Sequence, residues 1–95
     1  MDIENQLKII NKEVYEFNNE IRNNSNIIDY NKFIVIIDLL DKFISNISVD
    51  SKYNYDNIKS NNILSEILEA FNNNDLILVT DLLEYELLDL INSIF

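Results

Sequence analysis

The stretch LILVTDLLEYELLDLINSIF, residues 76–95, decides the fold of this chain. Thirteen of its twenty residues are apolar. When the stretch is drawn as an α-helix, with about 100° per residue, most apolar positions fall in one broad arc. The arc contains Leu76, Val79, Leu83, Leu87, Leu90, Ile91 and Ile94. A helix that is apolar over so wide a surface is normally buried on several sides, which favours the central or last-docked helix of a bundle.

A second apolar ridge on this helix is formed by Leu78, Leu82 and Tyr85. Two interpretations are open: the ridge packs against a neighbouring helix, or it faces solvent and binds a partner or a second copy. We predict that it is at least partly exposed, because the first arc is already wide enough to close a four-helix core. Acidic side chains flank the ridge, as in the polar rim of a protein-binding patch. The predicted partner-binding residues are Leu78, Asp81, Leu82, Glu84, Tyr85, Glu86 and Asp89.

The rest of the chain also has the composition of a helical protein. It has 95 residues, enough for one small domain, and contains neither Gly nor Pro. Tight hairpin turns favour Gly, and the loops between strands often contain Pro. The absence of both residues therefore argues against an all-β fold. Asn takes the place of these residues in runs at 23–26 (with one Ser), 61–62 and 72–74.

Apolar residues with helical spacing predict four helices in one domain, residues 1–95. The predicted helices span residues 3–23, 30–48, 57–72 and 75–94. Asp2 and Asp29 precede the first two helices as N-caps, and Asn74 or Asp75 precedes the last. Short connections make each consecutive pair an αα-hairpin. The sequence therefore predicts an all-α, antiparallel four-helix bundle built from two hairpins.

The charge of the chain is strongly negative and unevenly distributed. Its formal net charge is −10, with 7 basic and 17 acidic residues. Residues 61–95 contain seven of the acids and no Lys or Arg. Such a field repels phosphate backbones and anionic lipid, so we expect neither nucleic-acid nor membrane binding. A basic protein partner is compatible with the charge, and so is a simple contribution to solubility.

Several classes of chemistry are disfavoured by the residue types that the chain lacks. There is no His and no Cys, which removes the usual general base, thiol nucleophile and soft metal ligands. Without Gly there is no phosphate-binding loop of the common kinds. We therefore expect no enzyme activity, no cofactor and no metal. The first residues lack a secretion signal and no run is long enough to span a membrane, so we expect a cytoplasmic protein.

The segment from Phe71 to Leu87 resembles the C-terminal segment of small helical proteins of low-GC Gram-positive bacteria. The shared pattern is D-x-x-L-x-x-D-L-L-E-Y-E-L, which begins here at Asp75. This chain has Thr80 where the family pattern has Ala, and Asp89 where a Pro is frequent. The resemblance covers 17 of the 95 residues and implies a helical fold. It implies a link to motility gene neighbourhoods and no particular activity.

Three classes of function are compared on this basis. The preferred hypothesis is a non-enzymatic protein-binding bundle, adaptor-like or chaperone-like, whose acidic C-terminal half faces a protein partner. The alternative is an acidic inhibitor or immunity protein that neutralises a basic toxin or nuclease. An enzyme that uses carboxylates is the least favoured. An interface built on the apolar ridge should survive about 0.5 M salt, whereas charge mimicry should not.

Overall fold

A computed structural model describes residues 2–23, 29–48 and 57–93 of the chain. All of its regular structure is helical, which confirms the all-α fold predicted from the sequence. The helices are α1 (Ile3–Asn23), α2 (Tyr30–Ser48), α3 (Asn57–Asn72) and a composite final helix made of α4 (Leu76–Asp81), η1 (Leu82–Leu87) and α5 (Leu88–Asn92). Residue 94, which the sequence places at the end of the last helix, lies outside the described residues.

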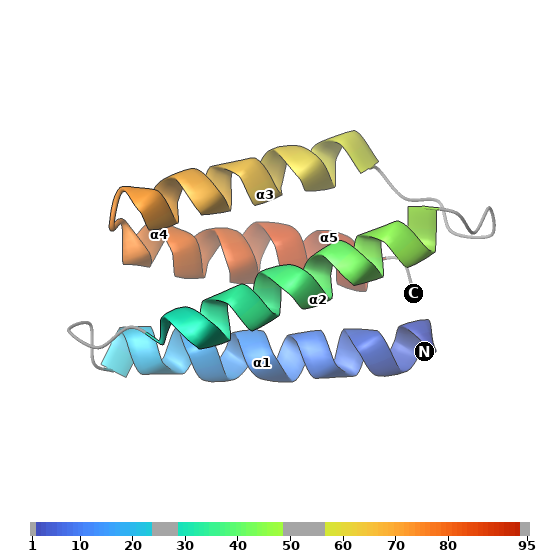
Figure 1. Cartoon of the computed structure of the whole chain (residues 1–95), viewed down its shortest axis with the longest axis horizontal. Helices are drawn as coiled ribbons and strands as arrows, with labels where there is room; N and C mark the ends of the chain where they lie inside the picture. The colour runs from blue at the N-terminus through green and yellow to red at the C-terminus, as the bar shows by residue number, and fades with distance from the viewer. Residues whose placement is uncertain (1, 24–28, 49–56, 94–95) are drawn as a thin grey trace.

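The four helices form an elongated bundle of two hairpins (Figure 1). Its principal extents are 42 × 23 × 19 Å. α1 packs along α2, α3 packs along the final helix, and the final helix also contacts α1. The final helix therefore has neighbours on two sides, as its wide apolar surface indicates. No helix in the described part of the chain is long and apolar enough to cross a membrane.

Aspartate side chains cap the N-terminal ends of three of the helices. The carboxylates of Asp2, Asp29 and Asp75 accept hydrogen bonds from backbone N–H groups of the first turn. The distances from nitrogen to oxygen are 3.2, 3.0 and 3.2 Å. These bonds satisfy donors that have no partner within the helix. In the turn before α4, Asn74 has a φ of 57°, a left-handed conformation that Asn tolerates better than most residues. Asn thus makes the turn without Gly.

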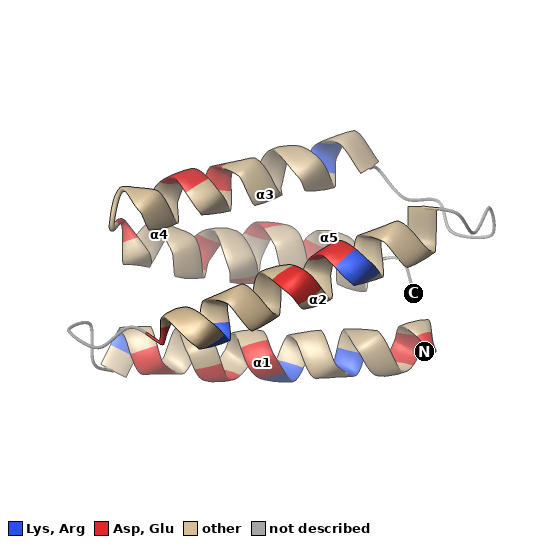
Figure 2. Cartoon of the chain, viewed as in Figure 1, with Lys and Arg blue, Asp and Glu red and all other residues tan. Residues whose placement is uncertain are grey.

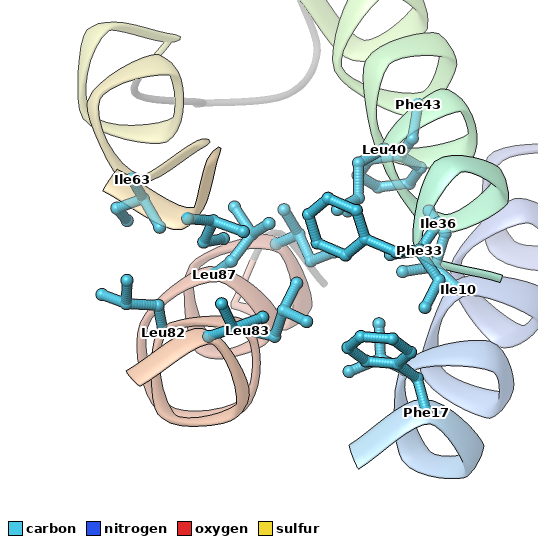
Figure 3. Packing of buried hydrophobic residues seen from close by; sticks show 14 of the residues in the cluster. Ile10, Phe17, Phe33, Ile36, Leu40, Phe43, Ile63, Leu82, Leu83 and Leu87 are labelled. Carbon is cyan, nitrogen blue, oxygen red and sulfur yellow. The ribbon is translucent and has the colours of Figure 1, made fainter. Parts of the chain in front are cut away.

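One continuous apolar core joins the four helices (Figure 3). Its most deeply buried members include Phe17 of α1, Phe43 of α2, Ile67 of α3 and Leu83 of the final helix, each 0% exposed. Burying a side chain of this size stabilises the fold by about 1.5–3 kcal/mol. The core residues of the final helix are Val79, Leu82, Leu83, Leu87 and Ile91.

The middle of the final helix is a π-helix, which the sequence analysis did not predict. The Leu88 N–H donates to the carbonyl of Leu83, five residues earlier. The reason lies in a spacing of four between the deepest core residues, Val79, Leu83, Leu87 and Ile91. In a straight α-helix each such step turns the side chain by about 40°, so the three steps together turn it by about 120°. The wider π turn holds more residues and keeps all four side chains on the core, each 0% exposed.

Candidate functional site

The predicted ridge on the final helix is not one exposed strip. Leu78 and Tyr85 are 42% and 64% exposed, but Leu82 between them is 6% exposed and belongs to the core. Figure 3 shows Leu82 on the α3 side of the final helix, close to Ile63. The prediction of an exposed ridge is therefore wrong at Leu82, because α3 covers a second face of the final helix. For this residue the alternative interpretation, packing against a neighbouring helix, is correct.

Three of the predicted residues, Tyr85, Glu86 and Asp89, line one groove between α3 and the final helix. We call this the acidic groove; its volume is about 750 Å³. Glu66 lines it from α3, and neither Glu66, Glu86 nor Asp89 has an ion-pair partner among the described residues. The remaining lining residues are Ile58, Lys59, Asn62, Ile63, Leu90 and Ser93. Ile58 is 76% exposed, so the groove combines carboxylates with accessible apolar surface.

Two other predicted residues, Asp81 and Glu84, tie the final helix to α1. The guanidinium of Arg22 lies 3.0 Å from a Glu84 carboxylate oxygen and 3.6 Å from one of Asp81. The hydrogen bond from Arg22, followed by that from the Tyr85 hydroxyl, lowers the pKa of Glu84 below its usual value. The same Glu84 carboxylate raises the pKa of the Tyr85 hydroxyl. Asp81 and Glu84 are thus engaged within the chain, and Arg22 offsets part of the acidic charge.

Leu78, the remaining predicted residue, lies apart from both groups. It lines a smaller hollow of about 320 Å³ with Glu66, Glu69 and Asp75. Glu66 also lines the acidic groove, so it connects the two surfaces. The seven predicted residues therefore divide into a groove-lining group, an ion-pair group, one core residue and one residue in this hollow.

The Arg22–Glu84 pair should make a small part of the stability depend on pH. The pKa of Glu84 in the folded chain lies below its ordinary value of 4.5, so its stabilising contribution is present above that pH and is lost as the pH falls through the folded-state pKa. The two side chains are 35% and 36% exposed, so the contribution should stay within about 1 kcal/mol. Glu84→Gln should lower the thermal midpoint at neutral pH, and its midpoint should converge with that of the parent once the pH falls below the folded-state pKa of Glu84. Parallel midpoint curves at every pH would contradict this. Glu86→Gln is the control, because Glu86 has no ion-pair partner among the described residues.

A second groove, between α2 and α3, was missed by the sequence analysis. We call it the apolar groove; it is lined by Phe33, Ile34, Ile37, Asp38, Asp41, Leu64 and Leu68 and has a volume of about 410 Å³. Ile34 of α2 and Leu68 of α3, which both line this groove, are 63% and 43% exposed. The signal was present in the apolar run Ile34–Ile37, which is longer than one buried helical face requires.

A buried polar contact lies just before the π-helix. The Asn18 side-chain amide of α1 donates to the backbone carbonyl of Thr80 at 3.2 Å, and the Thr80 hydroxyl donates to the carbonyl of Ile77 at 2.8 Å. Asn18 is 2% exposed, and its own side-chain oxygen accepts no hydrogen bond from the part of the chain that the structure describes. This contact attaches α1 to the backbone of α4, so its role is structural.

No group of three or more acidic side chains in the described residues is arranged to hold a metal ion. A family model, described as a domain of unknown function (DUF8042), matches residues 1–94. The chain belongs to the DUF8042 family. Comparisons of this DUF8042 chain with curated proteins and with solved structures found no match.

Acidic residues lie in both hairpins of this DUF8042 domain, but most of the described basic residues lie in the first (Figure 2). The described residues of α3 and the final helix contain one basic side chain, Lys59, at the start of α3. The other described basic residues are Lys8, Lys12 and Arg22 of α1 and Lys32 and Lys42 of α2. The acidic groove therefore lies entirely within the more negative hairpin, away from most of the basic residues.

Proposed function

We propose that this DUF8042 domain is a non-enzymatic protein-binding bundle, and that its acidic C-terminal half faces a partner protein with a basic surface segment. The observation that supports this most directly is the composition of the acidic groove. Glu66 stands on one wall and Glu86 and Asp89 on the other, and none of them has an ion pair among the described residues. A Lys or Arg side chain between the walls would reach carboxylates from two helices.

Apolar contact supports the same proposal, because charge alone gives little affinity in water. Tyr85 and Ile58 are 64% and 76% exposed at the groove, and Ile63 and Leu90 also line it. Interfaces combine an apolar, often aromatic centre with a polar rim, and Tyr is enriched among the residues that contribute most. The groove has both parts within two helices.

Two of the described carboxylates, Glu84 and Glu16, have lowered pKa values, and both are held in ion pairs. The pKa of Glu84 is lowered by Arg22, and that of Glu16 is lowered by Lys32, which lies 3.0 Å from its carboxylate. Both shifts come from surface ion pairs between helices, which hold the carboxylates in the charged form. A general acid would need a shift in the other direction at neutral pH. These observations favour binding over chemistry.

The test is affinity capture from a lysate of the source organism with three forms of the chain. The groove variant is Glu86→Gln with Asp89→Asn, and the matched control is Glu4→Gln with Glu20→Gln, which removes the same charge from exposed positions of α1. We expect the parent and the control to retain one protein that the groove variant loses by about tenfold or more. Equal retention by all three forms, or no retained protein, would overturn the proposal.

Repeating the capture at a higher salt concentration distinguishes the proposed function from the alternative, an acidic inhibitor. Two of the seven acids between residues 61 and 95, Asp81 and Glu84, are paired with Arg22, which leaves less free charge for mimicry of a nucleic acid. A partner held by apolar and polar contacts together should remain bound at about 0.5 M salt. Complete release at that salt concentration would favour the inhibitor function instead.

A further inference from the structure

We propose that the apolar groove between α2 and α3 docks one amphipathic helix of a partner protein, with basic residues along the edge of that helix. This inference goes beyond the acidic groove, because the two surfaces share no lining residue. It therefore holds or fails independently of the function proposed above.

The shape of the bundle supports a helical occupant. α2 and α3 approach each other less closely than the two helices of either hairpin do. They meet at aromatic rings: Phe33 and Phe71 stack with centroids 3.8 Å apart, and Tyr30 packs edge-on against Phe71 at 5.6 Å. Next to these rings, apolar side chains from both helices line the groove. A groove between two helices is the usual receptor for an amphipathic helix.

The apolar residues of the groove match the contacts that a helix makes. Ile34 and Ile37 are three residues apart on α2, and Leu64 and Leu68 are four residues apart on α3. Each pair therefore forms a continuous row along its helix. A docked helix with apolar residues at i, i+3, i+4 and i+7 would pack against both rows at once. The docked helix would cover the apolar side chains that α2 and α3 leave exposed in this groove.

The charges on the edge of the groove favour a basic partner over a second copy of this chain. Asp38 is 3.0 Å from Lys42 on the same helix, whereas Asp41 has no ion-pair partner among the described residues. A Lys or Arg on the docked helix would meet Asp41 beside the apolar rows. A second copy would bring the same aspartates and a further net charge of −10, and the like charges would repel.

The experiment uses a fluorescent Leu/Lys peptide of about five helical turns, with Leu at i, i+3, i+4 and i+7 of each repeat. Binding is measured by fluorescence anisotropy at about 0.5 M salt, which screens non-specific attraction between a cationic peptide and an acidic protein. The comparison peptides are a scrambled sequence of the same composition and a version with Glu in place of Lys. The groove variants are Ile34→Glu and Leu68→Glu, and the matched control is Val35→Glu, a 48% exposed apolar residue of α2 that does not line the groove.

We expect the amphipathic Leu/Lys peptide to bind the parent and the Val35→Glu control with similar affinity. Each groove variant should bind it at least about tenfold more weakly, while its thermal midpoint stays close to that of the control. Equal binding of the scrambled or the Leu/Glu peptide, equal loss in Val35→Glu, or no binding would overturn the proposal. Sedimentation that shows a dimer disrupted by Ile34→Glu would also overturn it, because a second copy would then be the occupant.

Discussion

Leu82→Glu should lower the free energy of unfolding by about 3–5 kcal/mol, the usual cost of an uncompensated charge in a protein interior. Leu82 is 6% exposed and belongs to the apolar core, on the side of the final helix that faces α3. The new carboxylate would take the place of an apolar core side chain, so it would be buried without solvation or would push α3 away. For a chain of this size we expect the thermal midpoint to fall by more than about 10 °C.

The matched control is Ile77→Glu in α4, five residues earlier on the same helix. Ile77 is 60% exposed, so the same substitution should change the free energy of unfolding by no more than about 0.5 kcal/mol. Both variants are compared by urea denaturation and by thermal melting at neutral pH. An unchanged midpoint in Leu82→Glu would show that α3 does not cover this face of the final helix.

The sequence was informative wherever one helical face meets one neighbour. In α1 the spacing of Ile10, Val14, Phe17 and Ile21 is regular, and all four side chains are at most 1% exposed. The Asp residues before the first two helices were predicted as caps and act as caps. These features depend on contacts close in sequence or on a single stripe of apolar residues, so residue types and spacing are sufficient to predict them.

The final helix was harder to predict because it packs against two neighbours at once. A helical projection shows that Leu82 lies beside the main apolar arc, but it does not show where α3 will be. The same projection assumes about 100° per residue, which fails through the π-helix at Leu82–Leu87. The candidate site was therefore predicted only in part: Tyr85, Glu86 and Asp89 share a groove, while Asp81 and Glu84 are paired with Arg22.

The position of the apolar groove was missed for a related reason. The apolar run Ile34–Ile37 indicates more apolar surface than one buried face of α2 requires, but it does not show that Ile34 and Leu68 line one groove, where they are 63% and 43% exposed. Their exposure arises from the distance between α2 and α3, which depends on how the two hairpins pack together. The stack of Phe33 on Phe71 fixes one place where these helices meet. Spacing along either helix contains no information about this contact between them.

Deletion of Glu86 should leave the fold intact and change the free energy of unfolding by no more than about 1 kcal/mol. The spacing of core residues gives the reason. Removing one residue from the π-helix brings Leu87 and Ile91 one position closer to Leu83, so the steps from Val79 become four, three and four. This is the spacing of the buried residues Ile10, Val14, Phe17 and Ile21 in α1, which is a regular α-helix. The final helix could then be α-helical throughout with the same residues on the core.

Deletion of Tyr15 in the middle of α1 is the matched control. Tyr15 is exposed, as Glu86 is, but α1 has no extra residue to lose. Its removal would rotate one half of the apolar stripe by about 100° relative to the other half and place polar residues in the core. We expect a loss of more than about 3 kcal/mol for this variant, measured by urea denaturation with the slope of the transition compared between variants. A Glu86 deletion as harmful as the Tyr15 deletion would show that the π-helix itself is needed for packing.

The expected difference between the two deletions bears on why the π-helix is present. If the fold is stable without Glu86, the core does not require the π turn. The reason for the additional residue would then lie in where the π turn places Glu86 on the surface. That position is the wall of the acidic groove, beside Tyr85 and opposite Glu66. Single π turns within α-helices are frequent at functional sites. If the Glu86 deletion variant is stable but no longer captures the proposed partner, then the extra residue is needed for binding and not for folding.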